Sequence, residues 1–195
     1  MSKIVIIDYG AGNVKSVKFA LDRLGIGYEL SRSAETIQSA DKLLFPGVGE
    51  ASSSMKALEE YGLTEVIKDA KQPFLGICLG MQMMCESSEE NDTKGLGIFP
   101  LPVKLFDSTD VKVPHMGWNQ VEDLQTPIFD GLEEKEYMYF VHSYYVPDSE
   151  WTIAKANYPA PFSAALHKDN FYGCQFHPEK SGSFGQKILE NFVRM

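Results

Sequence analysis

A cysteine held between two glycines is the first feature of this sequence that could do chemistry. Gly76-Ile-Cys78-Leu-Gly80 matches the nucleophile-elbow pattern G-x-S-x-G, with cysteine in place of serine. Residues 73–77 predict a short apolar strand, and residues 81–85 predict the start of a helix. Small flanking residues allow the tight turn, and the N–H groups at a helix start favour a thiolate. A buried structural cysteine in an ordinary strand–helix turn would fit the same pattern.

A thiolate nucleophile needs an imidazole to move protons and a third group to orient it. The sequence has four histidines, at positions 115, 142, 167 and 177. His167 reads as a surface strand residue, whereas His177 ends an apolar strand and is followed by Pro178 and Glu179. Proline keeps the preceding residue extended, and residues two apart in extended chain face the same way. We therefore expect Glu179 to orient His177, although a polar turn after a strand is the alternative.

The first half of the chain alternates strands and helices, which predicts a parallel sheet. Apolar runs at 3–7, 26–30, 42–45 and 73–77 are separated by helical patterns. Asn13, after the glycine loop that begins at Tyr9, could cap the first helix. Sites in such sheets lie at the carboxyl ends of the strands. Cys78 and the loop Pro46-Gly-Val-Gly49 both follow strand ends.

The Pro46–Gly49 loop allows three interpretations. Its two glycines could form a phosphate-binding turn, but the Lys-Ser/Thr of a P-loop is missing. It could also supply an oxyanion N–H beside Cys78, or it could be a plain tight turn.

The second half of the chain predicts antiparallel strands added to this sheet. The acidic stretch 86–92 reads as a solvated end of the helix after Cys78. Short extended pieces follow, with a hairpin near Asp169-Asn170 and a last helix over 183–194 that turns Phe184, Ile188 and Phe192 inward. The extended pieces are 96–99, 103–106, 111–114, 119–121, 137–146, 151–157, 162–168 and 171–176. The expected fold is α/β: one domain, 1–195, with an open, mostly parallel, flavodoxin-like mixed sheet flanked by helices.

Composition narrows the class of protein. A net charge of −9 and the lack of any Lys/Arg cluster argue against nucleic-acid binding. The three cysteines cannot all pair, and their spacing fits no zinc pattern. We expect a cytoplasmic protein, because no apolar run reaches membrane length and nothing resembles a signal peptide. Cys85 and Cys174 are expected in the core.

The motifs together resemble a known family. Gly76-Ile-Cys78-Leu-Gly-Met-Gln82, followed by Gln175-Phe-His177-Pro-Glu179-Lys180, resembles the class I (triad) glutamine amidotransferases. Three further motifs resemble the family of amidotransferase subunits of imidazole glycerol phosphate synthase, an enzyme of histidine biosynthesis. They are Pro46-Gly-Val-Gly49, Pro114-His-Met-Gly-Trp-Asn119 and Tyr139-Phe-Val-His-Ser-Tyr144. This resemblance spans the chain from Asp8 to Lys180.

The resemblance implies hydrolysis of L-glutamine to glutamate and ammonia through a Cys78 thioester. Cys78, His177 and Glu179 would be the catalytic triad. Backbone N–H groups of Leu79 and of the loop with Val48 and Gly49 would hold the oxyanion. The peptide plane at a valine flips less readily than the one at a glycine. We therefore hypothesise that Val48 leaves the oxyanion site incomplete until a partner docks.

The resemblance also assigns a substrate site and a partner. The residues expected to bind glutamine are Gly49, Gln82, Glu90, Ser143 and Tyr144. Ammonia would pass through a channel to a (β/α)₈-barrel cyclase subunit that forms imidazole glycerol phosphate and AICAR. Trp118, Tyr139 and Lys180 are the expected interface of this heterodimer. No cofactor, metal, nucleic acid or membrane is expected.

Three other interpretations remain at this point. The chain could be another partner-dependent amidotransferase, such as a pyridoxal phosphate or anthranilate synthase component. It could be a cysteine hydrolase or peptidase, although its loops are short for a peptide groove. It could also be an inactive docking subunit, against which the intact Cys78, His177 and Glu179 argue.

Overall fold

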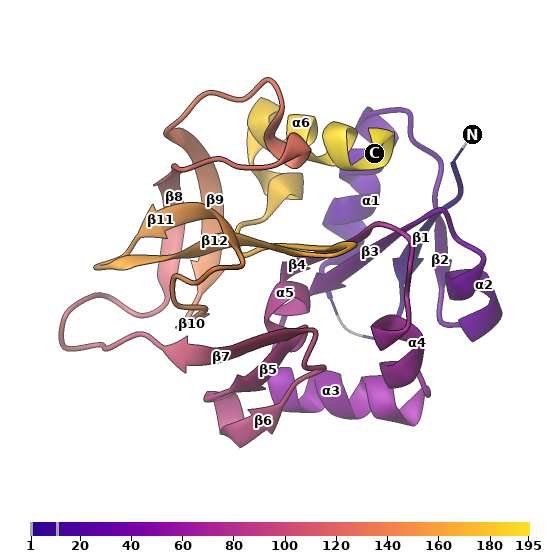
Figure 1. The fold of residues 1–195 in the computed structure, drawn as a ribbon, viewed down its shortest axis with the longest axis horizontal. Coiled ribbons are helices and arrows are strands. Elements are labelled where there is room, and N and C mark those ends of the chain that lie inside the picture. Colours follow the sequence, from indigo (N-terminus) through magenta and orange to yellow (C-terminus); the bar gives the residue numbers. More distant parts are fainter. Residues whose placement is uncertain (1, 11) are drawn as a thin grey trace.

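A computed structural model describes residues 2–10 and 12–195, and a mixed sheet lies at its centre (Figure 1). The strand order in this sheet is β11-β12-β13-β4-β3-β1-β2. The strands from β2 to β13 run parallel, and β12 and β11 add antiparallel. The strand bounds are β1 (Ile4–Ile7), β2 (Glu29–Ser31), β3 (Lys42–Gly47), β4 (Phe74–Cys78), β11 (Thr152–Asn157), β12 (Pro161–Lys168) and β13 (Phe171–Cys174). The mostly parallel mixed sheet predicted from the sequence is confirmed.

Helices cover both faces of the sheet, with α1 and α6 on one side and α3 on the other (Figure 1). Side chains along each strand point alternately to the two faces of the sheet, so the strands in the middle are buried on both sides by the helices. Ile4 and Ile6 pack toward α1 and α6, while Val5 and Ile7 pack toward α3. The helix bounds are α1 (Val14–Arg23), α2 (Ala34–Gln38), α3 (Ala51–Glu60), α4 (Thr64–Lys68), α5 (Leu79–Met83) and α6 (Gly182–Arg194).

The apolar face of α6 differs from the predicted one at its first turn. Ile188 and Phe192 are buried as expected, but Phe184 is 37% exposed. The buried stripe begins at Gly185 instead, because a Cβ atom there would lie 2.0 Å from the Pro178 oxygen. This close approach turns the neighbouring Phe184 toward solvent.

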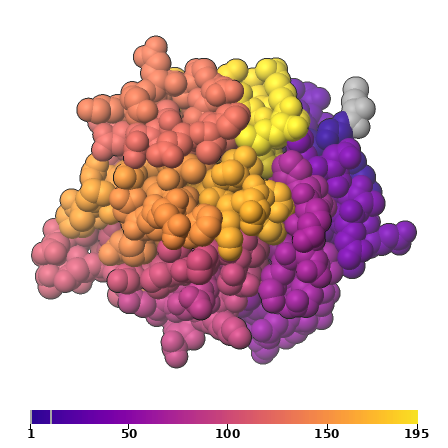
Figure 2. Space-filling view, in the orientation of Figure 1, coloured from indigo at the N-terminus to yellow at the C-terminus, as the bar shows by residue number. Residues whose placement is uncertain are grey.

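The second half of the chain builds two smaller sheets beside the central one. One has the order β10-β7-β5-β6, and the other is the hairpin β8-β9. The bounds are β5 (Cys85–Ser88), β6 (Thr93–Lys94), β7 (Phe99–Leu105), β8 (His115–Val121), β9 (Glu136–His142) and β10 (Tyr144–Tyr145). Three short 3₁₀ turns are η1 (Glu90–Asp92), η2 (Pro127–Phe129) and η3 (Pro178–Lys180). Figure 2 shows the later segments on one side of the face drawn and the earliest segments on the other.

Local predictions in this half are wrong at three places. Residues 96–98 form no strand, and the single strand β7 (Phe99–Leu105) replaces the two predicted pieces 96–99 and 103–106. Residues 86–92 are not a solvated helix end, because β5 starts at Cys85 and pairs with both β7 and β6. The piece 111–114 is not a strand. The predicted hairpin at Asp169-Asn170 is confirmed by the antiparallel pairing of β12 with β13.

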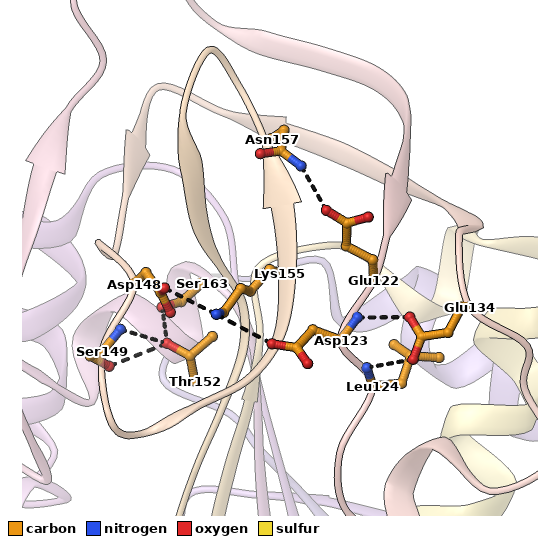
Figure 3. Close-up of polar contacts among 10 residues, drawn as sticks. All are labelled: Glu122, Asp123, Leu124, Glu134, Asp148, Ser149, Thr152, Lys155, Asn157 and Ser163. Carbon is orange, nitrogen blue, oxygen red and sulfur yellow. Dashed lines mark hydrogen bonds and ion pairs between the residues drawn. The ribbon is translucent and has the colours of Figure 1, made fainter.

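Polar contacts fasten β11 to the segment that follows β8 (Figure 3). The Lys155 ammonium lies 3.2 Å from a carboxylate oxygen of Asp123 and 3.1 Å from one of Asp148. At the end of β11, the Asn157 amide donates to the Glu122 carboxylate at 2.9 Å (Figure 3). These contacts fix the β8-β9 hairpin, which forms one wall of the pocket described next, against the central sheet.

Candidate active site

Cys78 lies on a sharp turn between β4 and α5. Its backbone φ is 54° and its ψ is −111°, a conformation that L-residues with side chains rarely adopt. The flanking glycines are required by packing: a Cβ atom on Gly80 would lie 1.9 Å from the Phe45 oxygen, and one on Gly76 would lie 2.9 Å from the Met81 nitrogen. The sulfur therefore lies at the carboxyl end of strand β4 and at the start of helix α5, as predicted.

The loop after β3 lies beside this elbow. Gly47 pairs with Cys78 in the sheet, and a Cβ atom on Gly47 would lie 2.4 Å from the Gly80 nitrogen. The buried Tyr9 hydroxyl donates to the Pro46 oxygen at 2.9 Å, which ties the loop to the chain after β1. Gly49 has a φ of 100°, which favours glycine. The expected oxyanion loop is thus next to Cys78.

His177 and Glu179 form a buried pair at the end of β13. The His177 Nδ1 atom lies 2.8 Å from a Glu179 carboxylate oxygen, and neither side chain is more than 1% exposed. The pairing was predicted, but the reason was wrong. Glu179 lies in the 3₁₀ turn η3 and not in extended chain, while His177 is extended (φ −101°, ψ 94°) before the proline.

A residue from the start of the chain completes this pair. The Asn13 side chain does not cap α1; its amide donates to the Glu179 carboxylate at 3.2 Å. Asn13 thus holds the N-cap position of α1, as expected, but its side chain binds Glu179 instead of capping the helix. The Ser181 hydroxyl donates to the His177 oxygen at 2.7 Å and accepts from the Tyr139 N–H at 3.0 Å.

The surroundings keep His177 protonated at neutral pH. Burial opposes charge on the ring, but the Cys78 sulfur and the Glu179 carboxylate favour it and raise the His177 pKa to about 10. The Nε2 atom is buried and has no hydrogen-bond partner in the described part of the chain. That nitrogen is thus available to a reacting group.

Cys78 and His177 line the same pocket, which has a volume of about 330 Å³. This is within the range of small-molecule sites. Leu79, Gly49 and Val48, the predicted oxyanion residues, also line it. So do the predicted glutamine-binding residues Gln82, Glu90, Ser143 and Tyr144. The structure therefore brings the predicted catalytic and glutamine-binding side chains to one pocket, apart from Glu179, which contacts His177 from behind.

Glu90 has a structural contact as well as a place on the pocket wall. Its carboxylate accepts from the Ala51 N–H at 2.6 Å, at the start of α3. Burial raises the Glu90 pKa, and the bond from Ala51 opposes that shift. The residue thus joins η1 to α3 beside the pocket.

Two residues of the site were not assigned from the sequence. Gln175 is fully buried, and its amide nitrogen lies 3.7 Å from the Cys78 sulfur. The His142 ring is buried in the pocket wall and donates from Nδ1 to the Tyr144 oxygen at 2.7 Å. Gln175 stands two residues before His177 in the predicted strand 171–176, and this position was the available signal. Nothing in the spacing indicated where His142 lies.

The other cysteines are not nucleophiles. Cys85 and Cys174 are buried free thiols, and burial raises the pKa of each. The expectation that both belong to the core is confirmed.

The three residues expected at a partner interface lie together outside the pocket. Trp118 and Tyr139 are paired across the β8-β9 hairpin, with ring centroids 5.9 Å apart. The Lys180 ammonium lies 5.7 Å from the Tyr139 ring. Trp118 is 55% exposed.

In residues 2–10 and 12–195, no helix has both the length and the apolar character needed to cross a bilayer.

Comparison with known proteins identifies the family. The family model described as "Glutamine amidotransferase class-I" matches residues 5–195. A solved glutamine amidotransferase superposes with a TM-score of 0.76 at 19% identity, covering 97% of each chain. PurLQS from Thermotoga maritima gives a TM-score of 0.70 at 16% identity, covering 100% of this chain and 99% of the other. These two likenesses concern the fold.

The chain therefore belongs to the class I glutamine amidotransferases, which are enzymes. Its sequence relatives narrow this. "Imidazole glycerol phosphate synthase subunit HisH" of Bacteroides fragilis is 52% identical over 99% of this chain and 100% of its own length. The protein of the same name from Mannheimia succiniciproducens is 52% identical over 97% of this chain and 98% of its own length. Within the class, the chain belongs to this HisH family.

Proposed function

We propose that this chain is the glutaminase subunit of imidazole glycerol phosphate synthase and that Cys78, His177 and Glu179 perform its chemistry. The observation that carries the proposal is the shared pocket. It is lined by a cysteine on a nucleophile elbow and by a histidine that a buried carboxylate orients. Around them the pocket presents amide, carboxylate and backbone groups suited to an amino-acid substrate.

The reaction divides into two halves. The Cys78 thiolate attacks the side-chain amide carbon of glutamine, and the resulting oxyanion is held by the N–H of Leu79 and an N–H of the 47–49 loop. Protonated His177 gives its proton to the departing nitrogen, so that ammonia leaves and a thioester remains. His177 then takes a proton from water as the water attacks the thioester, which releases glutamate and restores the sulfur. Glu179 holds the imidazole in the required orientation throughout.

The same proposal includes a partner. Ammonia is largely protonated in neutral water, so it would be passed directly to a cyclase subunit of (β/α)₈-barrel fold for formation of imidazole glycerol phosphate and AICAR. The exposed cluster of Trp118, Tyr139 and Lys180 supports a docking surface there, since aromatic residues are enriched in interfaces. One amidotransferase domain and a cytoplasmic location are part of the proposal. They are supported by the continuous sheet joining both halves and by three unpaired thiols.

The decisive test is ammonia release from glutamine by the purified chain, alone and with the matching cyclase. We expect turnover in the complex and its loss in Cys78→Ser. Stimulation by the synthase partner of another amidotransferase, but not by the cyclase, would overturn the assignment within the class. Comparable turnover of the free chain and of the complex would remove the hypothesis that Val48 keeps the oxyanion site incomplete.

A further inference from the structure

One buried amide behind the residues that line the pocket contacts the reacting sulfur and has no assigned role. Gln175 is fully buried just beyond β13. Its amide nitrogen lies 3.7 Å from the Cys78 sulfur, and its amide oxygen lies 2.8 Å from the Gln82 nitrogen. Both neighbours belong to the site proposed above.

The polarity of this contact follows from one backbone group. The Tyr144 carbonyl can only accept, and the Gln82 amide approaches it at 2.9 Å, so the atom facing it must be the NH₂ group. The second hydrogen of that NH₂ group then donates to Gln175, which must present its oxygen. The opposite end of the Gln175 amide is therefore an N–H donor, and it faces the Cys78 sulfur.

The sulfur has complementary contacts in its two protonation states. As a thiol it can donate to the Val141 oxygen, 3.8 Å away, while it accepts from Gln175. As a thiolate it only accepts, and a hydrogen bond to an ionised acceptor is stronger than one to a neutral acceptor. The Gln175 donor thus favours the thiolate.

We propose that Gln175 is a further catalytic residue, which donates an N–H to the Cys78 sulfur and fixes the Gln82 amide. Both hydrogens of the Gln82 NH₂ group are then used, by Tyr144 and by Gln175. The Gln82 oxygen is left to accept from an N–H group of the substrate. This inference rests on the proposed glutaminase chemistry, and it identifies one side chain that stabilises the nucleophile before substrate arrives.

The test measures the sulfur without glutamine or a partner. Iodoacetamide alkylation of Cys78 in the full-length chain is followed by mass spectrometry from pH 5 to pH 10. For Gln175→Met, which keeps the volume and removes the donor, we expect the alkylation profile to move to higher pH. At pH values below the midpoint of that profile the rate should fall about tenfold, because a hydrogen bond to the ionised sulfur is lost. Cys78→Ser controls for labelling of the buried thiols.

Two controls separate this role from a general loss of packing. Gln72→Met removes a comparable bond, from the Gln72 amide to the Ile37 oxygen at 2.8 Å, away from the pocket, and should leave the profile unchanged. For Gln82→Met, the fold-increase in the glutamine KM should exceed the fold-decrease in the alkylation rate. For Gln175→Met, both the alkylation rate and kcat should fall.

The proposal is overturned if folded Gln175→Met gives the wild-type alkylation profile, or moves it no further than Gln72→Met does. If Gln175→Met does not fold, the near-isosteric Gln175→Glu replaces it. This variant puts an oxygen opposite the sulfur and should slow alkylation at pH 7 to 9, and an unchanged rate would equally refute the role. A failure of cyclase-dependent turnover would not alter these readings, so the two proposals can fail separately.

Discussion

The Nδ1 atom of His115 lies 2.9 Å from the Nε2 atom of His142, and both rings are buried. Their protons have one consistent order. His142 must donate from Nδ1 to the Tyr144 oxygen, so its Nε2 accepts from His115, and the His115 Nε2 accepts from Asn119 at 3.3 Å. The Asn119 amide also donates to the Asn157 oxygen at 3.1 Å. A directed chain of hydrogen bonds thus joins the end of β11 to the pocket wall.

Acid should destabilise the protein through this pair. Burial lowers the His115 pKa to about 4 and the His142 pKa to about 3. The unfolded chain therefore binds more protons than the folded one below about pH 6.5, and the stability present above that pH is lost as pH falls toward 4. For His115→Asn we expect the slope of unfolding free energy against pH to fall by about 1.4 kcal/mol per pH unit near pH 5.

Denaturant unfolding of both proteins from pH 4.5 to pH 7.5 measures these slopes. The expectation concerns the difference between the two curves, because carboxylates titrate in both. Parallel curves would show that His115 does not resist protonation in the folded state.

Asn13 should matter for turnover although it is distant in sequence from the triad. Its amide bond to Glu179 helps to hold the carboxylate against His177. Asn13→Ala removes a hydrogen bond of about 1 kcal/mol, so kcat/KM in the complex should fall several-fold. Asn13→Asp places a like charge beside Glu179 and should cost roughly a hundredfold.

Asn191→Ala is the matched control for this comparison. It also removes amide bonds, to the Ile128 and Asp130 oxygens, but at α6 and away from the pocket. We expect it to affect melting temperature and not turnover. Equal kinetic effects in the Asn13 and Asn191 variants would exclude a specific role for the Asn13–Glu179 bond.

The sequence was sufficient for the parts of the site that depend on local spacing. The elbow around Cys78 and the pair His177–Glu179 each lie within a few residues, so their patterns were visible. The contacts Gln175–Cys78 and Asn13–Glu179 were not predicted, because the residues in each pair are 97 and 166 positions apart. Side-chain contacts at such separations depend on the sheet order, which places β13 beside β4 and α1 beside η3. Strand β5 was missed because its polar sequence gives no strand pattern. It forms because it pairs with β7 and β6.

The elbow should not tolerate a methyl group at Gly80. A Cβ atom there would lie 1.9 Å from the Phe45 oxygen, and backbone on both sides prevents relief. We expect Gly80→Ala to cost roughly 3 kcal/mol or more, measured by denaturant unfolding. Gly27→Ala, where no atom lies within 4 Å of the added Cβ, should be close to neutral. Similar stabilities for the two variants would contradict the tight packing of α5 on β3.

Trp118 should contribute to binding of the cyclase and not to folding of the chain. Its side chain is 55% exposed and its ring lies edge-on to that of Tyr139, so about half of its surface is free for a partner. Large aromatic anchors at interface centres often cost 2 kcal/mol or more when truncated to alanine. For Trp118→Ala we therefore expect the Kd for the cyclase to rise about thirtyfold, measured by titration calorimetry, with an unchanged melting temperature. Phe19 is 52% exposed on α1, so Phe19→Ala removes an aromatic side chain of similar exposure elsewhere. If both variants bind like the unmodified protein, Trp118 lies outside the interface, and the ammonia path must leave the pocket on another side of the hairpin.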